Sequence, residues 1–213
     1  MKRPLDGRLC LVTDRAFAGG RPLEDVVLSA VRGGVTVVQL REKNASTREF
    51  VALGRALRSL LRPWGVPLLI NDRVDVALAV GADGVHVGQS DMEVEDVRRL
   101  MGPTALVGLS VESVAKAKEA THLDVDYLGV GPIFPTGSKA DLAPLLGLEG
   151  LSAVRACSAL PLMAIGGIQA HNAQDVVAHG ADGLAVISAI CAAPDPESAA
   201  RQLRSIVDTK TAG

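Results

Sequence analysis

Residues 67–87 read PLLINDRVDVALAVGADGVHV, and this one stretch contains a strand, a helix and the start of a second strand. The apolar run 67–70 is typical of a buried strand, and segment 73–79 has the apolar spacing of a helix. A Gly-Ala-Asp-Gly turn at 81–84 then leads into another buried run at 84–87. This order predicts a strand–helix–strand unit of the kind that builds parallel sheets.

The same alternation extends in both directions, so that eight strand–helix units are expected. Strands are predicted at 9–13, 35–40, 67–70, 84–87, 105–109, 127–130, 161–165 and 183–187, and helices at 23–32, 47–61, 73–79, 94–101, 114–120, 151–157, 172–178 and 197–207. A doubly wound sheet usually has about five or six strands and a glycine-rich dinucleotide loop, which the first turn at 13–20 lacks. The α/β pattern therefore predicts a (β/α)₈ TIM barrel that forms a single domain over residues 1–213.

A short internal sequence repeat accompanies this pattern. The tetrapeptide Gly-Ala-Asp-Gly occurs at 81–84 and again at 180–183, four units apart and each time before a strand. It is consistent with similarity between two half-barrels. It is equally consistent with independent use of glycine and aspartate in turns that follow helices.

Composition excludes several classes of protein. Hydrophobic residues make up 48% and charged residues 22%, which excludes a disordered chain. The net charge of −2 gives no global field for nucleic acid, and the apolar runs are too short to span a membrane. Cys10, Cys157 and Cys191 lack metal-type spacing and are expected as reduced core thiols of a cytoplasmic protein. Aromatic residues make up only 2%, and of these only Phe17 and Phe134 are expected at the barrel mouth.

Polar residues at the carboxyl ends of the strands indicate where a barrel would place its site. After the second strand, alternation puts Gln39, Arg41 and Lys43 on one face, a donor set suited to a diphosphate. The alternative is a solvated strand end in which Glu42 pairs with Lys43.

Two aspartates follow the third and fourth strands. Asp72 comes directly after Asn71, and Asp91 ends the Gly-Gln-Ser-Asp segment at 88–91. Because neighbouring strands end side by side, the two carboxylates are expected to bind Mg²⁺ together with water and substrate oxygens. The alternative for each is a capping role at the start of the following helix.

Later loops offer further anion-binding groups. Ser110 follows the fifth strand, with helix capping as its alternative, and Thr136, Ser138 and Lys139 lie in a long Gly- and Pro-containing loop at 135–148. The Gly-Gly pair at 166–167 and Ser188 follow the last two strands, where barrels of this type commonly bind phosphate. His86, inside the fourth strand, is expected either at the mouth or as a hydrogen-bonded interior histidine.

Together these segments resemble the thiamine-phosphate synthase family. The resemblance rests on residues 38–43 (VQLREK), 70–73 (INDR), 84–91 (GVHVGQSD), 131–136 (GPIFPT) and 166–168 (GGI), in the family's order and over nearly the whole chain. It implies condensation of hydroxymethylpyrimidine diphosphate with a thiazole phosphate, or its carboxylated form, to thiamine phosphate and diphosphate. The implied cofactor is Mg²⁺. Ser138 stands where the family commonly has threonine, and 140–147 is less proline-rich than expected.

The resemblance also implies a role for each matching residue. The pyrimidine diphosphate would be bound by Gln39, Leu40, Arg41, Glu42, Lys43, Asn71, Ser110 and Lys139, of which Arg41, Lys43 and Lys139 are the catalytic cations. The thiazole phosphate would be bound by Thr136, Gly137, Ser138, Gly166, Gly167, Val186, Ile187 and Ser188, and the metal by Asp72 and Asp91. The expected mechanism is dissociative, since an amino-substituted pyrimidine stabilises the cation left when diphosphate departs.

Other functions are weighed against this one. A thiazole tautomerase-like paralogue would carry a histidine near Gly131-Pro132, where this chain has proline. A sugar-phosphate epimerase or aldolase needs an acid–base pair or a Schiff-base lysine within a strand, and none is evident. A non-catalytic binding or regulatory barrel predicts a damaged metal pair or a missing Lys43. The expected partners are small-molecule substrates, with neither nucleic acid nor membrane, and exposed apolar barrel surfaces are compatible with a homodimer.

Overall fold

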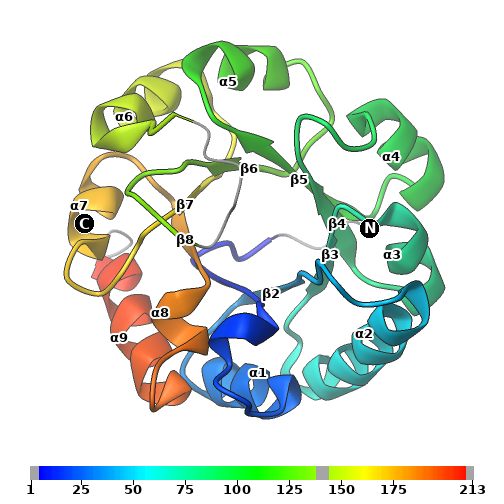
Figure 1. Cartoon of the computed structure of the whole chain (residues 1–213). Helices are drawn as coiled ribbons and strands as arrows, with labels where there is room; N and C mark the ends of the chain where they lie inside the picture. The colour runs from blue at the N-terminus through cyan, green and yellow to red at the C-terminus, as the bar shows by residue number, and fades with distance from the viewer. Residues whose placement is uncertain (1–4, 138–143, 210–213) are drawn as a thin grey trace.

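The computed structural model describes residues 5–137 and 144–209, and its strands close into a parallel barrel in chain order (Figure 1). The strands are β1 Leu9–Val12, β2 Val37–Leu40, β3 Leu68–Asn71, β4 Gly84–Val87, β5 Leu106–Val111, β6 Tyr127–Val130, β7 Leu162–Ile165 and β8 Gly183–Val186. Each strand pairs with its successor, and β1 pairs with β8 to close the ring. The predicted (β/α)₈ barrel is confirmed.

Helices surround the barrel and connect its strands. They are α1 Leu23–Arg32, α2 Thr47–Leu61, α3 Val74–Val80, α4 Val94–Met101, α5 Val114–Ala120, α6 Gly147–Cys157, α7 Ala173–Ala178, α8 Ser188–Cys191 and α9 Pro196–Asp208. Four of them have the predicted bounds, whereas α6 begins four residues earlier than expected and the short α8 was not predicted. Short 3-10 turns lie at Arg15–Phe17 and Arg62–Trp64.

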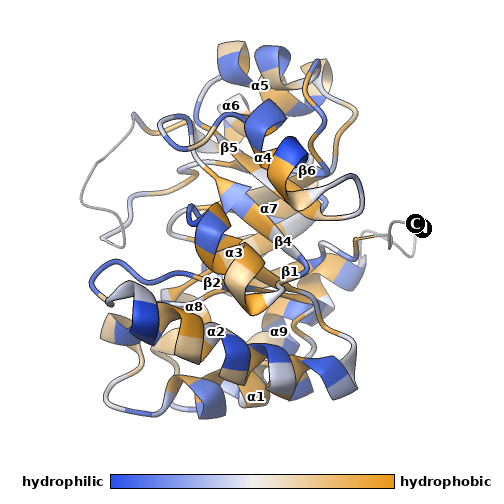
Figure 2. Ribbon diagram, turned by 90° about the vertical axis from the view of Figure 1, so that its right-hand side faces the viewer, coloured by the Kyte–Doolittle hydropathy of each residue, from blue (hydrophilic) through white to orange (hydrophobic). Residues whose placement is uncertain are grey.

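Apolar side chains pack in two layers. The larger layer lies between the strands and the helices, whose outer faces are hydrophilic (Figure 2). The smaller layer fills the barrel interior and consists of Cys10, Val12, Val37, Leu69, Leu106, Tyr127, Met163 and Ala185. All three cysteines are free thiols. Among the described residues, no helix is both long enough and apolar enough to cross a membrane.

One polar contact recurs at the amino-terminal face of the barrel, before every even-numbered strand. Asp83, Asp126 and Asp182 each accept a hydrogen bond from the backbone N–H near the start of the preceding odd strand, at 2.8–2.9 Å. Thr36 Oγ1 accepts the equivalent bond before β2, at 3.0 Å. Asp126 makes this contact without a Gly-Ala-Asp-Gly sequence. The repeated Gly-Ala-Asp-Gly tetrapeptide is therefore explained by this recurring aspartate contact in the turns, without a duplication of half-barrels.

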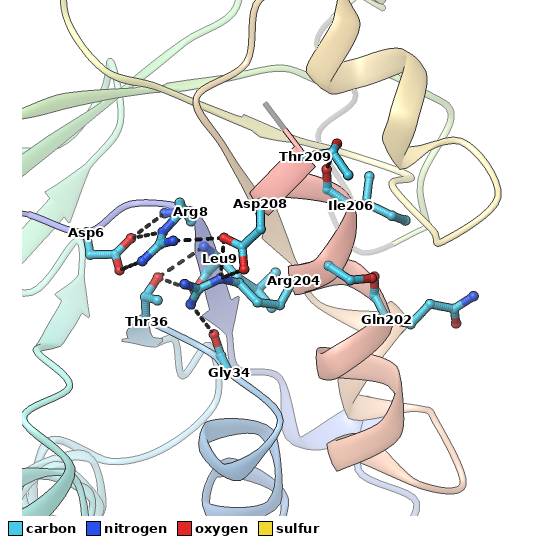
Figure 3. A network of polar contacts seen from close by, with 11 residues as sticks. Asp6, Arg8, Leu9, Gly34, Thr36, Gln202, Arg204, Ile206, Asp208 and Thr209 are labelled. Carbon is cyan, nitrogen blue, oxygen red and sulfur yellow. Dashed lines mark hydrogen bonds and ion pairs between the residues drawn. The ribbon is translucent and has the colours of Figure 1, made fainter. Parts of the chain in front are cut away.

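A charged cluster connects the two ends of the described chain at the same face (Figure 3). Arg8 lies 2.7 Å from Asp6 Oδ2 and 2.8 Å from Asp208 Oδ1, and Arg204 lies 2.9 Å from Asp208. Arg204 also donates to the carbonyl of Gly34 at 3.0 Å. The Arg8 hydrogen bond lowers the pKa of Asp6. This cluster joins the segment before β1 to α9, at the end of the barrel opposite the candidate site.

Candidate active site

A cavity with polar groups set in a largely apolar wall lies inside the barrel, toward the carboxyl ends of the strands. Four residues of the predicted site line it together: Gln39, Arg41, Asn71 and Ser110. Ile187, another predicted site residue, also lines it. The other lining residues are Cys10, Val12, His86, Tyr127, Gly129, Met163, Ile165 and Ala185. The structure thus brings together polar residues from β2, β3, β4, β5 and β6.

Arg41 is the charged group of this cavity, and its residue exposure is only 6%. One guanidinium nitrogen, Nη1, lies 3.0 Å from Asp14 Oδ2, and the Arg41 backbone N–H donates to Thr13 Oγ1 at 3.1 Å. The other terminal nitrogen, Nη2, is buried and has no hydrogen-bond partner among the described residues. A buried donor without a partner is costly, so this nitrogen is suited to an incoming anion.

The residues around Arg41 depart from the expected alternation because β2 ends at Leu40. Leu40 packs in the layer between strands and helices, so only its backbone is available to the cavity. Glu42 forms its ion pair with Arg15 at 2.8 Å, and burial raises the pKa of the Glu42 carboxyl. Lys43 is exposed and does not line the cavity. Of the three donors predicted to share a face, Gln39 and Arg41 therefore line the cavity together and Lys43 does not.

Asp72 and Asp91 lie at the carboxyl ends of the adjacent strands β3 and β4, and both are exposed. Asp72 has a left-handed backbone with φ 62°, which is rare for a residue other than glycine. The N-cap of α3 is Arg73 and that of α4 is Glu93, so both proposed capping roles are wrong. Asp91 instead accepts a hydrogen bond from the Gly88 N–H at 2.7 Å.

A chain of hydrogen bonds crosses the cavity floor. His86 Nδ1 lies 2.8 Å from Tyr127 Oη, and His86 Nε2 lies 2.8 Å from Ser110 Oγ. Burial raises the pKa of Tyr127 well above its usual value, and the nearby Gln39 side chain offsets only part of this effect. The N-cap of α5 is Ser113, so the capping alternative for Ser110 is wrong. Both expectations for His86 hold, since it is interior, hydrogen-bonded and part of the cavity wall.

The loops after β6 and β7 lie against each other. The backbone N–H of Phe134 donates to the carbonyl of Gly166 at 3.0 Å. Gly166 and Gly167 have φ of 103° and 64°, and a Cβ on Gly167 would come within 2.6 Å of the Pro135 carbonyl. Glycine is therefore required there both by conformation and by close approach. This contact brings the segment that leads to Thr136 and Gly137 beside the glycine pair.

The segment after β8 borders the same loops. Val186 is buried in the layer beneath the helices, which leaves only its backbone for a ligand. Ser188 begins α8, and its hydroxyl lies 3.4 Å from Gln169 Nε2, in the loop after β7. Predicted site residues Ser138 and Lys139 lie outside the described residues.

Two residues of the site were missed from sequence, Asp14 and Tyr127. Asp14 directly follows the Thr13 that ends the first predicted strand, so applying the rule of polar strand ends to that strand would have found it. Tyr127 begins β6, and alternation places it on the same face as Gly129. Its place in the cavity corrects the expectation that aromatic side chains would reach the site only from loops.

Comparisons with known proteins agree on one family. A family model described as thiamine monophosphate synthase matches residues 9–190. The thiamine-phosphate synthase of Albidiferax ferrireducens is 58% identical over 94% of this chain and 92% of its own length. That of Solidesulfovibrio magneticus is also 58% identical, over 98% of this chain and 99% of its own. The solved thiamine phosphate pyrophosphorylase from Pyrococcus furiosus is 42% identical, with a TM-score of 0.88 over 97% of this chain and 98% of that one.

Proposed function

Because the chain belongs to the thiamine monophosphate synthase family, we propose that it condenses a hydroxymethylpyrimidine diphosphate with a thiazole phosphate. The products are thiamine phosphate and diphosphate, and the carboxylated thiazole phosphate is an alternative acceptor. The chain is accordingly a transferase of thiamine biosynthesis. No second function is favoured by a particular observation.

The buried Nη2 of Arg41 is the observation that carries the proposal for the site. Arg41 lines a cavity together with Gln39, Asn71 and Ser110, which offer the hydrogen-bonding groups that a polar heterocycle needs. Arg41 already uses Nη1 for Asp14, so a diphosphate oxygen at Nη2 would complete its hydrogen bonding without displacing a protein contact.

The donor set also fits Mg²⁺. Asp72 and Asp91 supply carboxylate oxygens from adjacent strand ends, and the described residues contain no cluster of three or more acidic, His or Cys ligands. Mg²⁺ commonly takes only one or two carboxylates and completes its octahedron with water and substrate phosphate oxygens. We therefore assign Asp72 and Asp91 as its ligands. When bound, the ion would supply positive charge that stabilises the leaving diphosphate.

The chain's own residues then have separate tasks in a dissociative reaction. Arg41 holds the diphosphate, while Lys43 and Lys139 add positive charge as the bond to the pyrimidine methylene breaks. Thr136, Gly167 and the neighbouring residues hold the thiazole phosphate, so that its ring nitrogen attacks the pyrimidine cation. The nucleophile belongs to the substrate, and the reaction requires no nucleophilic side chain. The protein must instead exclude water from the cation.

The cysteines and the outer surface support two subsidiary proposals. All three cysteines are free, which favours a reducing compartment such as the cytoplasm. Leu78 on α3 and Leu100 on α4 are 48% and 47% exposed, and this is apolar surface of the kind that a homodimer would cover. Light scattering of the purified protein at several concentrations tests the second proposal.

Product formation tests the function. We expect the purified chain, given both substrates and Mg²⁺, to form thiamine phosphate and diphosphate in equal amounts, and to stop when the metal is chelated. Arg41→Ala is expected to lower kcat/KM by at least about 100-fold, because a charged partner of the diphosphate is lost. Arg99→Ala, which removes an exposed arginine paired with Asp96 on α4, is the matched control and is expected to retain activity. Absence of product with the unmodified chain would overturn the proposal.

A further inference from the structure

The loop between β1 and α1 contacts both halves of the proposed site. Its first residues face the diphosphate side, where Asp14 pairs with Arg41 at 3.0 Å and Arg15 pairs with Glu42 at 2.8 Å. Its last polar residue, Arg21, faces the other neighbour of β1, the short helix α8 after β8. Figure 1 shows the turn after β1, in blue, beside α8, in orange, and the two elements are in contact. The loop therefore connects the segment after β2 with the segment after β8.

Arg21 donates hydrogen bonds to three backbone carbonyls through its guanidinium group. Its Nε donates to Ala18, in its own loop, at 2.9 Å. Its Nη1 donates to Ala193 at 2.9 Å and its Nη2 to Cys191 at 2.7 Å, both at the carboxyl end of α8. The last carbonyls of a helix lack partners within the helix, and an arginine suits them through its charge and its several donors. Arg21 thus ties the loop after β1 to α8.

This tie fixes a short element that carries part of the site. Ile187, the N-cap of α8, lines the cavity together with Arg41, and Ser188 begins α8 as a proposed contact of the thiazole phosphate. The buried Ile190 side chain packs α8 against the core, but apolar contacts have no preferred direction. Hydrogen bonds to one planar group are directional. The orientation of α8 relative to Arg41 therefore depends on Arg21.

We propose that Arg21 is a positioning residue that keeps the thiazole side of the site aligned with Arg41, so that the thiazole rather than water captures the pyrimidine cation. The inference rests on the proposed function, because it concerns the second substrate of that reaction. When the bond between the pyrimidine methylene and the diphosphate breaks, both electrons leave with the diphosphate oxygen. A lone pair of the thiazole nitrogen then forms a C–N bond, or a lone pair of water forms a C–O bond. In the second case the water loses one proton to solvent, and the product is the free hydroxymethylpyrimidine.

A small displacement of the thiazole is enough to change this competition. A reactant held in line has an effective concentration of about 10⁵–10⁸ M, and a displacement of about 1 Å can slow its reaction about 100-fold. A cation that waits for a misplaced thiazole is open to any water that enters the cavity. The ratio of diphosphate released to thiamine phosphate formed therefore measures the alignment directly.

The test measures both products in one reaction that contains both substrates and Mg²⁺. Arg21→Met removes the three donors and keeps most of the length of the side chain. We expect this variant to release at least about twice as much diphosphate as thiamine phosphate, whereas the unmodified chain releases equal amounts. KM for the thiazole phosphate should rise about 10- to 100-fold. KM for the pyrimidine diphosphate should stay within about 3-fold, because the pair between Asp14 and Arg41 is untouched.

The same reaction in H₂¹⁸O shows which bond water attacks. Capture of the cation puts ¹⁸O into the hydroxymethyl group, whereas hydrolysis at phosphorus puts it into the released diphosphate. We expect the label in the hydroxymethyl group. Label found only in the diphosphate would overturn the inference, even where diphosphate is in excess.

Two further variants separate positioning from stability. Arg98→Met is the matched control, because Arg98 also donates to two backbone carbonyls, those of Asp124 and Ala105, but at the amino-terminal face of the barrel. We expect it to lower the melting temperature and to keep the two products equal. Arg21→Lys keeps the charge but has one compact ammonium in place of the planar fork, so we expect an intermediate excess of diphosphate. This variant also provides the test if Arg21→Met does not fold.

A purely structural role for Arg21 would lower the melting temperature and leave the two products equal. That result in Arg21→Met and Arg21→Lys would overturn the inference, as would the same excess of diphosphate in Arg98→Met. Failure of the unmodified chain to form thiamine phosphate would instead overturn the proposed function, so the two failures are distinguishable.

Discussion

The ion pair between Arg41 and Asp14 offers a direct way to test how the site holds its cation. Asp14→Asn removes the negative charge but retains an oxygen that can accept hydrogen bonds. One such bond is the 3.0 Å contact from the Ala16 N–H that caps the first 3-10 turn. The substitution therefore perturbs the partner of Arg41 while sparing the local loop.

The expected magnitude follows from distance and burial. Arg41 Nη1 and Asp14 Oδ2 are 3.0 Å apart, and the two side chains are 7% and 20% exposed. At an effective dielectric constant of about 20, their attraction is roughly 5 kcal/mol. Because the single asparagine oxygen stays on the Ala16 N–H, the amide NH2 faces Arg41, and solvent screening at this partly exposed position offsets roughly half of the lost attraction. We therefore expect a loss of about 2–3 kcal/mol, which corresponds to a fall of roughly 5–10 °C in melting temperature.

Activity should change in a characteristic way. Because Arg41 would no longer be held toward the cavity, we expect KM for the pyrimidine diphosphate to rise about 10- to 50-fold, with a smaller change in KM for the thiazole phosphate. Glu119→Gln removes the same charge from an exposed ion pair with Lys116 on α5 and is the matched control, with little expected effect. Unchanged melting temperature and unchanged KM in Asp14→Asn would refute the reasoning.

Three further perturbations address other parts of the molecule. Asp126→Ala should destabilise the barrel by about 1–3 kcal/mol in urea unfolding, because the Val107 N–H loses its acceptor and Arg98 loses the partner of Nη2 while keeping Asp124. A loss under about 0.5 kcal/mol would contradict this. Gly167→Ala should raise KM for the thiazole phosphate about 10-fold or more and leave KM for the pyrimidine diphosphate nearly unchanged, since φ of 64° is strained for alanine. An equal rise in both KM values would count against the assignment of Gly167 to the thiazole phosphate. Arg8 lowers the pKa of Asp6 below its usual 3.8, so this contact should stabilise the fold above about pH 4 and lose its effect as the pH falls through the lowered pKa. Asp6→Asn should therefore make the free energy of unfolding less dependent on pH in that acid range. The same pH dependence in the variant as in the unmodified chain would contradict this.

The barrel was predictable because its pattern is repeated. Each strand is a short apolar run followed by a helix of amphipathic spacing, and a single misplaced boundary leaves the other units unaffected. The four-residue α8 was missed because one turn carries no periodicity. The early start of α6 at Gly147 was missed because glycine there indicated a loop.

The candidate site was predictable only as far as local alternation extends. Gln39 and Arg41 could be placed together because a strand alternates, and Lys43 could not because β2 ends at Leu40. The contact between Tyr127 and His86 depends on Gly108 in the strand between them, which is a tertiary relation. The two aspartates were ambiguous in sequence because capping and metal binding use the same side chain, and the observed caps resolved the ambiguity against capping.

The central claim is that the buried Nη2 of Arg41 receives the diphosphate of the pyrimidine substrate. A crystal structure with the pyrimidine diphosphate and Mg²⁺ tests it directly. The account predicts a diphosphate oxygen within about 3 Å of Nη2, the metal between Asp72 and Asp91, and the pyrimidine ring over Gln39 and Ser110. A diphosphate bound elsewhere, with Nη2 still lacking a partner, would contradict it.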